Sequence, residues 1–265
     1  MVRQRTGKRK IGTSGINKQR WLEFLLKDEF AFNSEIHLLG SGEKPVDCLP
    51  EDGVESGCGW FLTFSDTEAG EWNLARPFGE SEEYLKILTQ FPPKVPFHLL
   101  VPLSDADTTL KKRGLIKSEN LIWHRSVGES TEIPFLELDD KKEEFLFSET
   151  TGELRLKFLE EEPGDLYKWK LKGYLLKDDS IVSLVKTVHA TPESVEVYIE
   201  TIPGRRDLGL GTQLLKEFAK RVHNAGRTLI YVVSEENSPS LKVAAKVGLK
   251  PYMTLARIPF CNGHR

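Results

Sequence analysis

Several features that define common protein classes are missing or sparse in this sequence of 265 residues. No apolar run approaches the roughly 20 residues that a transmembrane helix needs, and the first residues lack the apolar stretch of a secretory signal. The formal net charge is −3, which argues against a chain built to coat nucleic acid. We therefore expect a soluble, cytoplasmic protein that does not enter membranes, with nucleic acid disfavoured as a partner.

Cysteine is equally scarce. The three cysteines, Cys48, Cys58 and Cys261, include no pair separated by two residues, so neither a disulfide framework nor a zinc site is indicated. The six histidines are scattered without the spacing of metal ligands, and we predict no metal. Hydrophobic residues make up 39% of the chain and charged residues 29%, so a packed core with a well-solvated surface can form.

Charge is distributed unevenly along the chain. Residues 1–20 contain seven basic residues and no acidic residue (Arg3, Arg5, Lys8, Arg9, Lys10, Lys18 and Arg20). We interpret this segment as a disordered tail, with a polyanion-binding arm or a targeting peptide as alternatives. Residues 137–165 contain eleven acidic and four basic residues, and the run Glu160–Gly164 indicates a connection between folded units. The predicted organisation is a tail (1–20), an N-terminal α/β domain (21–145) and a C-terminal domain (146–265).

The C-terminal part has the clearest periodicity. Its expected elements are strands at 171–177, 181–189 and 195–202, a helix from Thr212 to Asn224, a strand at 229–233, a helix from Asn237 to Gly248 and a strand at 252–258. The run 195–202 alternates strictly, which places Glu196, Tyr198 and Glu200 on one face. Thr212 and Asn237 are the expected helix caps. The order β-β-β-α-β-α-β predicts an α/β (α+β) fold with a mixed, mostly antiparallel sheet flanked by helices.

The segment Arg205–Thr212 joins the end of a strand to the start of a helix. A helix N-terminus exposes unpaired N–H groups and carries partial positive charge. Glycines let the backbone approach an anion, and arginine adds charge-assisted donors. Together these features predict a diphosphate-binding loop, with a plain strand-to-helix turn as the alternative. A Walker loop is excluded because no Gly-Lys-Ser/Thr follows, and a Rossmann fingerprint fits poorly because the strand comes from an antiparallel meander.

The residues around this loop resemble a known family. Arg206-x-x-Gly209-x-Gly211 after the strand, and the run Ile199–Pro203 before it, resemble the acyl-CoA loop of the GNAT superfamily of N-acetyltransferases, in particular its glycine N-acyltransferase-like members. The downstream residues Asn237, Ser240, Leu241, Ala245, Lys246, Gly248 and Leu249 are similar to the family's next strand-and-helix segment. The resemblance covers about residues 171–258 and implies a GNAT fold.

The resemblance implies an acyl-CoA-dependent N-acyltransferase. Acetyl-CoA would be the cosubstrate, and the acetyl group would pass to an amine of a small or amino-acid-like acceptor by direct attack in a ternary complex. The strand around 199–202 would separate from the strand 229–233 and leave a gap for the pantetheine arm. The acyl-CoA site would contain Ile199, Thr201, Ile202, Arg206, Leu208, Gly209, Leu210, Gly211, Thr212, Asn237 and Ser240. We expect a monomer or homodimer. The alternatives are a CoA-binding pseudoenzyme or regulatory module and a protein N-acetyltransferase.

The catalytic residues are less clearly marked. Acyl transfer to an amine needs a general base, and Glu196 and Glu200 are the candidates; a solvated strand face is the alternative for each. The family often has a tyrosine four residues before the helix-ending glycine, as the acid that protonates the leaving thiolate. Here that position is Ala244. Tyr231, Ser234 or water would have to supply the proton instead, or activity would be low.

The N-terminal half is expected to repeat the same order. Its expected elements are a strand at 59–65, a helix at 81–89, a strand at 95–103, a helix at 106–114 and a strand at 120–125. The run Arg76–Ser81 echoes Arg206–Gly211 at an offset of 130 residues, and Gly114-Leu115 echoes Gly248-Leu249 at an offset of 134 residues. These two near-equal offsets suggest an internal duplication. We hypothesise a tandem GNAT-like pair with a degenerate first member, because Pro77, Glu80 and Glu82 disfavour a diphosphate. An unrelated substrate domain is the alternative.

Overall fold

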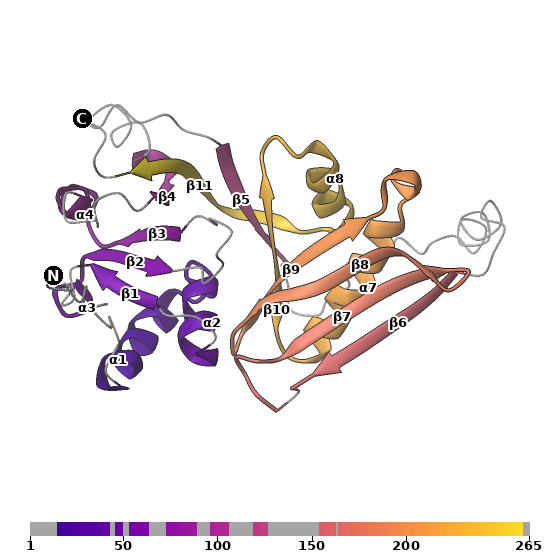
Figure 1. Ribbon diagram of the computed structural model, residues 1–265, viewed down its shortest axis with the longest axis horizontal. Helices are drawn as coiled ribbons and strands as arrows, with labels where there is room; N and C mark the ends of the chain where they lie inside the picture. The colour runs from indigo at the N-terminus through magenta and orange to yellow at the C-terminus, as the bar shows by residue number, and fades with distance from the viewer. Residues whose placement is uncertain are drawn as a thin grey trace, which may run out of the picture.

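One mixed sheet runs through the whole molecule. The computed structural model describes residues 15–42, 46–49, 53–63, 73–88, 96–105, 119–126, 154–162 and 164–261. The elements are α1 (Gly15–Leu25), η1 (Leu26–Asp28), α2 (Asn33–Ser41), β1 (Val46–Leu49), α3 (Gly53–Ser56), β2 (Gly59–Thr63), β3 (Asn73–Phe78), α4 (Ser81–Ile87), β4 (Pro96–Pro102), β5 (Glu119–Arg125), β6 (Leu154–Glu161), β7 (Lys170–Lys177), β8 (Ser180–Ala190), β9 (Ser194–Thr201), η3 (Pro203–Arg205), α7 (Leu210–Asn224), β10 (Thr228–Ser234), α8 (Ser238–Val247) and β11 (Lys250–Cys261). Among these residues the strand order is β1-β2-β3-β4-β11-β5-β10-β9-β8-β7-β6 (Figure 1).

The C-terminal half follows the predicted order. Strands β6 to β9 form an antiparallel meander, and α7 then returns the chain so that β10 runs parallel to β9. The apolar face of α7 packs on the meander, and its residues Leu214, Leu215 and Phe218 are fully buried. This burial explains why the helical spacing was readable in the sequence.

The N-terminal half repeats the β-α-β unit. Strand β3 runs parallel to β4 across α4, as β9 runs parallel to β10 across α7. A glycine with left-handed backbone precedes each helix, Gly79 at φ +83° and Gly209 at φ +77°, and the two positions are separated by the predicted offset. The described residues of this half therefore support the expected duplication.

The run Arg76–Ser81, predicted as the counterpart of the phosphate loop, is mostly not a loop. Arg76, Pro77 and Phe78 belong to strand β3, so only Gly79 and Glu80 separate that strand from α4. The strand continues through Arg76 because its guanidinium is buried, 3.4 Å from the carboxylate of Glu35. It also lies over the rings of Phe32 and Trp123.

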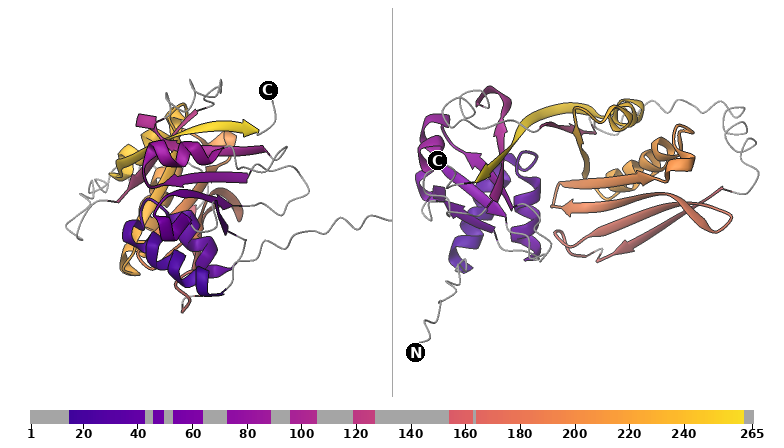
Figure 2. Two further views of the ribbon diagram at one scale, coloured as in Figure 1. Left: turned by 90° about the vertical axis from the view of Figure 1, so that its left-hand side faces the viewer. Right: turned by 45° about the horizontal axis from the view of Figure 1, so that its top comes forward.

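Two strands are shared between the halves. Strand β5 comes from the N-terminal half but lies between β10 and β11 of the C-terminal half. Strand β11 in turn pairs with β5 near its start and with β4 near its end, and both cross between the halves in Figure 1. The right-hand view of Figure 2 shows β11, in yellow, running from one half to the other. The predicted boundary at residue 145 lies outside the described residues, and strands on either side of it exchange partners.

Some elements escaped prediction. Residues 154–161 form the edge strand β6 where the acidic run indicated a connection; an exposed, charged edge strand lacks the apolar alternation of a buried one. Residues 15–20, assigned to the basic tail, lie in α1. Outside the described residues lie the rest of that tail, the predicted helix 106–114 and the repeat of Gly248-Leu249 at Gly114. In the described part of the chain, no helix is long and apolar enough to cross a bilayer.

A buried polar cluster joins the N-terminal helices to the meander. Glu29 is 5% exposed, and its carboxylate accepts hydrogen bonds from the Thr191 hydroxyl, the Ser194 hydroxyl and the Glu193 amide. On α2, Nδ1 of His37 lies 3.2 Å from the amide nitrogen and 3.1 Å from the carbonyl oxygen of Ala190. These contacts fix the turn from β8 to β9, and hence the start of the strand that carries the candidate bases.

Candidate functional site

The central feature of the site is the separation of β9 from β10. Their parallel register covers three residue pairs, Ser194 with Thr228, Val195 with Leu229, and Glu196 with Ile230. Beyond this point β9 continues beside β8 as far as Thr201, while β10 continues beside β5. The predicted gap between the strands is therefore confirmed. We call the end of the pairing, at Glu196 and Ile230, the apex.

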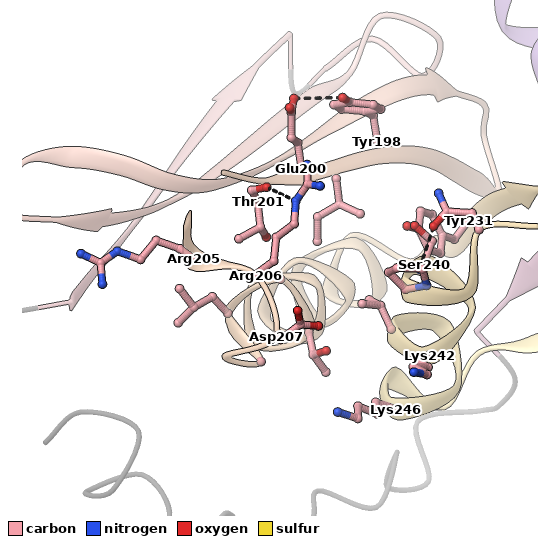
Figure 3. A pocket seen from close by; sticks show the side chains of 18 residues that line it. Tyr198, Glu200, Thr201, Arg205, Arg206, Asp207, Tyr231, Ser240, Lys242 and Lys246 are labelled. Atoms are coloured by element: carbon pink, nitrogen blue, oxygen red, sulfur yellow. Dashed lines mark hydrogen bonds between the residues drawn. The ribbon is translucent and has the colours of Figure 1, made fainter. Parts of the chain in front are cut away.

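A groove of about 460 Å³ occupies this gap (Figure 3). Its walls are the end of β9, the loop that leads into α7, the first turn of α7, Tyr231 of β10 and one side of α8. Ile199 and Thr201 line it from one face of β9, and Tyr198 and Glu200 from the other. Because both faces of the strand contribute, the groove connects the helix side of the sheet with the opposite side.

The loop before α7 has an unusual backbone. Asp207 and Gly209 have positive φ values of +65° and +77°, a conformation in which successive N–H groups can form an anion-binding concavity. Gly209 is the N-cap of α7 and provides no side-chain cap, so the amides of Leu210, Gly211 and Thr212 have no partner within the helix. Thr212 lies in the first turn, and its predicted capping role is wrong because the helix begins two residues earlier.

Gly211 marks a close approach between α7 and β9. A Cβ atom at this position would lie 3.0 Å from Oγ1 of Thr201 and 3.6 Å from Cδ1 of Ile199. The start of the helix is thus packed directly against the strand that lines the groove. A larger residue would push the two apart and displace the uncapped amides.

Basic side chains outnumber acidic ones around the groove. Arg205, Arg206, Lys242 and Lys246 line it together with the acids Glu200 and Asp207. Nε of Arg206 donates to the Thr201 carbonyl at 3.0 Å, which holds its guanidinium at the end of β9. The sequence did not mark the two lysines as site residues, although their spacing of four places both on one side of a helix.

Asn237 and Ser240 begin α8 at the far wall of the groove. Oδ1 of Asn237 accepts a hydrogen bond from the Ser240 amide at 3.1 Å, so the helix-cap interpretation of Asn237 is confirmed. Both residues also line the groove. Of the two helix N-termini here, only that of α7 lacks a side-chain cap.

The structure does not bring every predicted residue into the groove. Ile202 and Leu208 are exposed and lie outside the lining. Glu200 lines the groove and accepts a hydrogen bond from the Tyr198 hydroxyl at 2.9 Å. Glu196 does not line it, and its Oε2 lies 3.0 Å from Nδ1 of His189 at the apex, on the side of the sheet opposite α7.

The candidate proton donors differ in their position relative to the groove. Ala244 is completely buried in the core between α8 and the sheet. The Ser234 hydroxyl accepts from the Glu236 amide at 3.4 Å and lies outside the groove lining. Tyr231 lines the groove, and burial raises the pKa of its phenol while a hydrogen bond with Ser240 opposes that shift.

Comparison with known proteins gives the fold class. Residues 175–258 match the model of a GNAT-related family described as FR47-like protein. A GCN5-related N-acetyltransferase-like protein from Streptococcus suis 89/1591 is 14% identical with a TM-score of 0.56, over 92% of this chain and 99% of that one. A tandem GNAT protein from the clavulanic acid biosynthesis pathway is 12% identical with a TM-score of 0.54, over 94% and 96%. A GCN5-related N-acetyltransferase from Kribbella flavida is 11% identical with a TM-score of 0.51, over 96% and 98%.

These likenesses establish a GNAT fold for the chain. The C-terminal half, which contains the family match and the groove, resembles the GNAT superfamily, and the whole chain is similar to a tandem GNAT protein. No curated protein sequence matches this chain closely enough to serve as a relative.

Proposed function

We propose that this chain is an acyl-CoA-dependent N-acyltransferase that transfers an acetyl group to the amine of a small or amino-acid-like acceptor. The observation that carries the proposal is the separation of β9 from β10 directly beside the uncapped N-terminus of α7. The GNAT fold supports such an activity in general terms.

The groove fits an acyl-CoA chemically. The amides from Leu208 to Thr212 would hold the diphosphate, with Arg206 beside it, because a helix N-terminus and charge-assisted donors favour negative charge. Asn237 and Ser240 would border the pantetheine arm, which would lie along Ile199 to Thr201. When bound, acetyl-CoA supplies a thioester whose carbonyl carbon can be attacked by an amine.

Glu196 is the better placed of the two candidate bases. A ligand whose diphosphate lies at the loop would extend along β9 toward the apex, where Glu196 lies. Glu200 is four residues nearer the loop, about 13 Å along a strand that rises about 3.3 Å per residue. The neighbouring His189 orients the Glu196 carboxylate. We infer that Glu196 accepts the proton of the amine, directly or through water.

The N-terminal half would complete the site without binding a second acyl-CoA. Its β3–α4 connection retains only Gly79 and Glu80, and α4 has Glu82 and Glu83 in its first turn, which repel an anion. Helix α2 packs against β8 and β9. We propose that this half forms one wall of the acceptor site.

Calorimetry and an acceptor panel test this function. We expect acetyl-CoA to bind with one site per chain, and CoA release to accelerate with at least one member of a panel of small amines, amino acids and peptides. Absence of binding would refute the proposal. Binding without turnover on any acceptor would favour the pseudoenzyme, which the loss of the family tyrosine at Ala244 makes the leading alternative.

A further inference from the structure

Tyr231 lies where the two strands part. It follows Ile230, the last residue of β10 that pairs with β9. Its side chain is 5% exposed and points to the α7 and α8 side of the sheet, with Leu229 and Val233. Glu196 lies opposite Ile230 in the strand register, and its side chain is on the other side of the sheet, beside His189. A phenol and a carboxylate thus flank the apex from opposite faces of the sheet.

Two other hydroxyl groups of the groove, those of Tyr198 and Thr201, are less suited to donate a proton at the apex. The Tyr198 hydroxyl donates to Glu200 and belongs to the opposite face. Oγ1 of Thr201 lies 2.9 Å from Oγ of Ser183, near the outer end of β9. The Tyr231 hydroxyl is hydrogen bonded to the side chain of Ser240, and the two residues lie next to each other in Figure 3.

We propose that Tyr231 is the catalytic acid of this chain, donating its phenolic proton to the sulfur of the departing CoA, and that Ser240 positions the phenol. The assignment rests on the proposed acyltransferase function. As the new C–N bond forms and the C–S bond breaks, the electron pair of the broken bond goes to sulfur and takes up the phenolic proton. The phenolate then recovers a proton from water through the Ser240 hydroxyl, and the amine proton leaves to Glu196.

The burial of Tyr231 is compatible with this role. A buried phenol stays protonated at neutral pH and so is available as an acid, not as a base. A thiolate in the same desolvated groove also has a raised pKa, which makes it a better proton acceptor. This chain thus provides, from a strand, the acid that relatives with the family tyrosine provide from a helix.

The test compares CoA bound to the wild-type chain and to Tyr231→Phe. The pKa of the bound thiol is measured from the ultraviolet absorbance of the thiolate during a pH titration. A hydrogen bond from the phenol stabilises the thiolate, so we expect the bound thiol to titrate about one to two pH units higher in Tyr231→Phe. Tyr174→Phe, in strand β7 and outside the groove lining, is the matched control and should leave the titration unchanged.

The outcomes separate this inference from the function on which it rests. If wild-type protein binds CoA but Tyr231→Phe leaves the thiol pKa in place, the role of Tyr231 is refuted and the acyltransferase proposal stands. If wild-type protein binds no CoA, both the role of Tyr231 and the acyltransferase proposal are refuted. With a productive acceptor, kcat should drop about a hundredfold in Tyr231→Phe at an unchanged Kd for CoA; an equal kcat would also refute the assignment.

Discussion

Substitution of Gly209 by glutamate is the most direct perturbation of the proposed phosphate loop. A Cβ atom at Gly209 meets nothing within 4 Å, so the new side chain can be accommodated in space. Its backbone at φ +77° is left-handed, which costs about 1–2 kcal/mol of stability for a residue other than glycine. The carboxylate would stand at the N-terminus of α7, in the region where we place the diphosphate.

The effect on binding can be worked out from Coulomb's law. Two like charges about 4 Å apart repel by about 4 kcal/mol at the effective dielectric constant of 20 that suits protein surfaces. The exposed side chain can swing away and solvent ions screen it, so we take about 3 kcal/mol, which corresponds to a roughly hundredfold increase in Kd. Calorimetry with acetyl-CoA measures this change, and thermal unfolding measures the strain separately.

Gly226 offers a matched control at the other end of the same helix. Its φ is +74°, and a Cβ atom there also meets nothing within 4 Å. Helix α7 has 15 residues, so about 22 Å separates its ends, more than twice the screening length of about 8 Å at physiological salt. We expect Gly226→Glu to lose similar stability and to retain its affinity for acetyl-CoA. Equal affinity of Gly209→Glu and wild type, or equal losses in both variants, would refute the loop assignment.

Two further predictions concern single titratable groups. Glu196→Gln should lower kcat about a hundredfold without changing the Kd of acetyl-CoA, and Glu200→Gln should lower kcat less; steady-state kinetics showing the reverse order would make Glu200 the base. His98 is buried beside Arg257, and burial, with help from that cation, lowers the pKa of His98 to about 4. Because the unfolded chain takes up this proton from about pH 6.5 downward, its contribution to stability is present above pH 6.5 and is lost as pH falls toward 4, about 3 kcal/mol in all. Urea unfolding of His98→Gln at pH 7 and pH 4.5 should show a smaller difference than wild type, and an identical difference would contradict the assignment.

The sequence predicted well where local patterns coincide with tertiary packing. Val195 and Val197 alternate with Glu196 and Tyr198, and the structure buries the first pair and leaves the second more open. Gly209 lies at the start of a helix, in the strand-to-helix loop that the sequence predicted. These features are local, since one strand face and one helix start suffice to produce them.

The features that escaped prediction depend on distant partners. Arg76 resembles Arg206 in sequence, but its ion pair with Glu35 holds it in a strand, and no local pattern reveals such a contact. The insertion of β5 between β10 and β11 likewise depends on pairing across more than a hundred residues of chain, for example Trp123 with Val232. Lys242 and Lys246 follow a readable helical spacing, yet only the fold shows that this side of α8 faces the groove.

The shared strands explain how a degenerate half can remain necessary to the other. Strand β5 pairs with β10 along residues 230–234, and residues 231–234 are the part of β10 that no longer pairs with β9. Without β5, the backbone N–H and C=O groups of β10 beyond the apex would lose their hydrogen-bond partners. Unpaired strand edges tend to pair with a neighbouring strand, which here is β9, and such pairing would close the gap. The N-terminal half therefore holds the groove open from the side of β10, while the Glu29 cluster fixes β9 from the other side. The N-terminal half thus has only Gly79 and Glu80 where we propose a phosphate loop in the C-terminal half, but it supplies the strand β5 that pairs with β10 beside the gap.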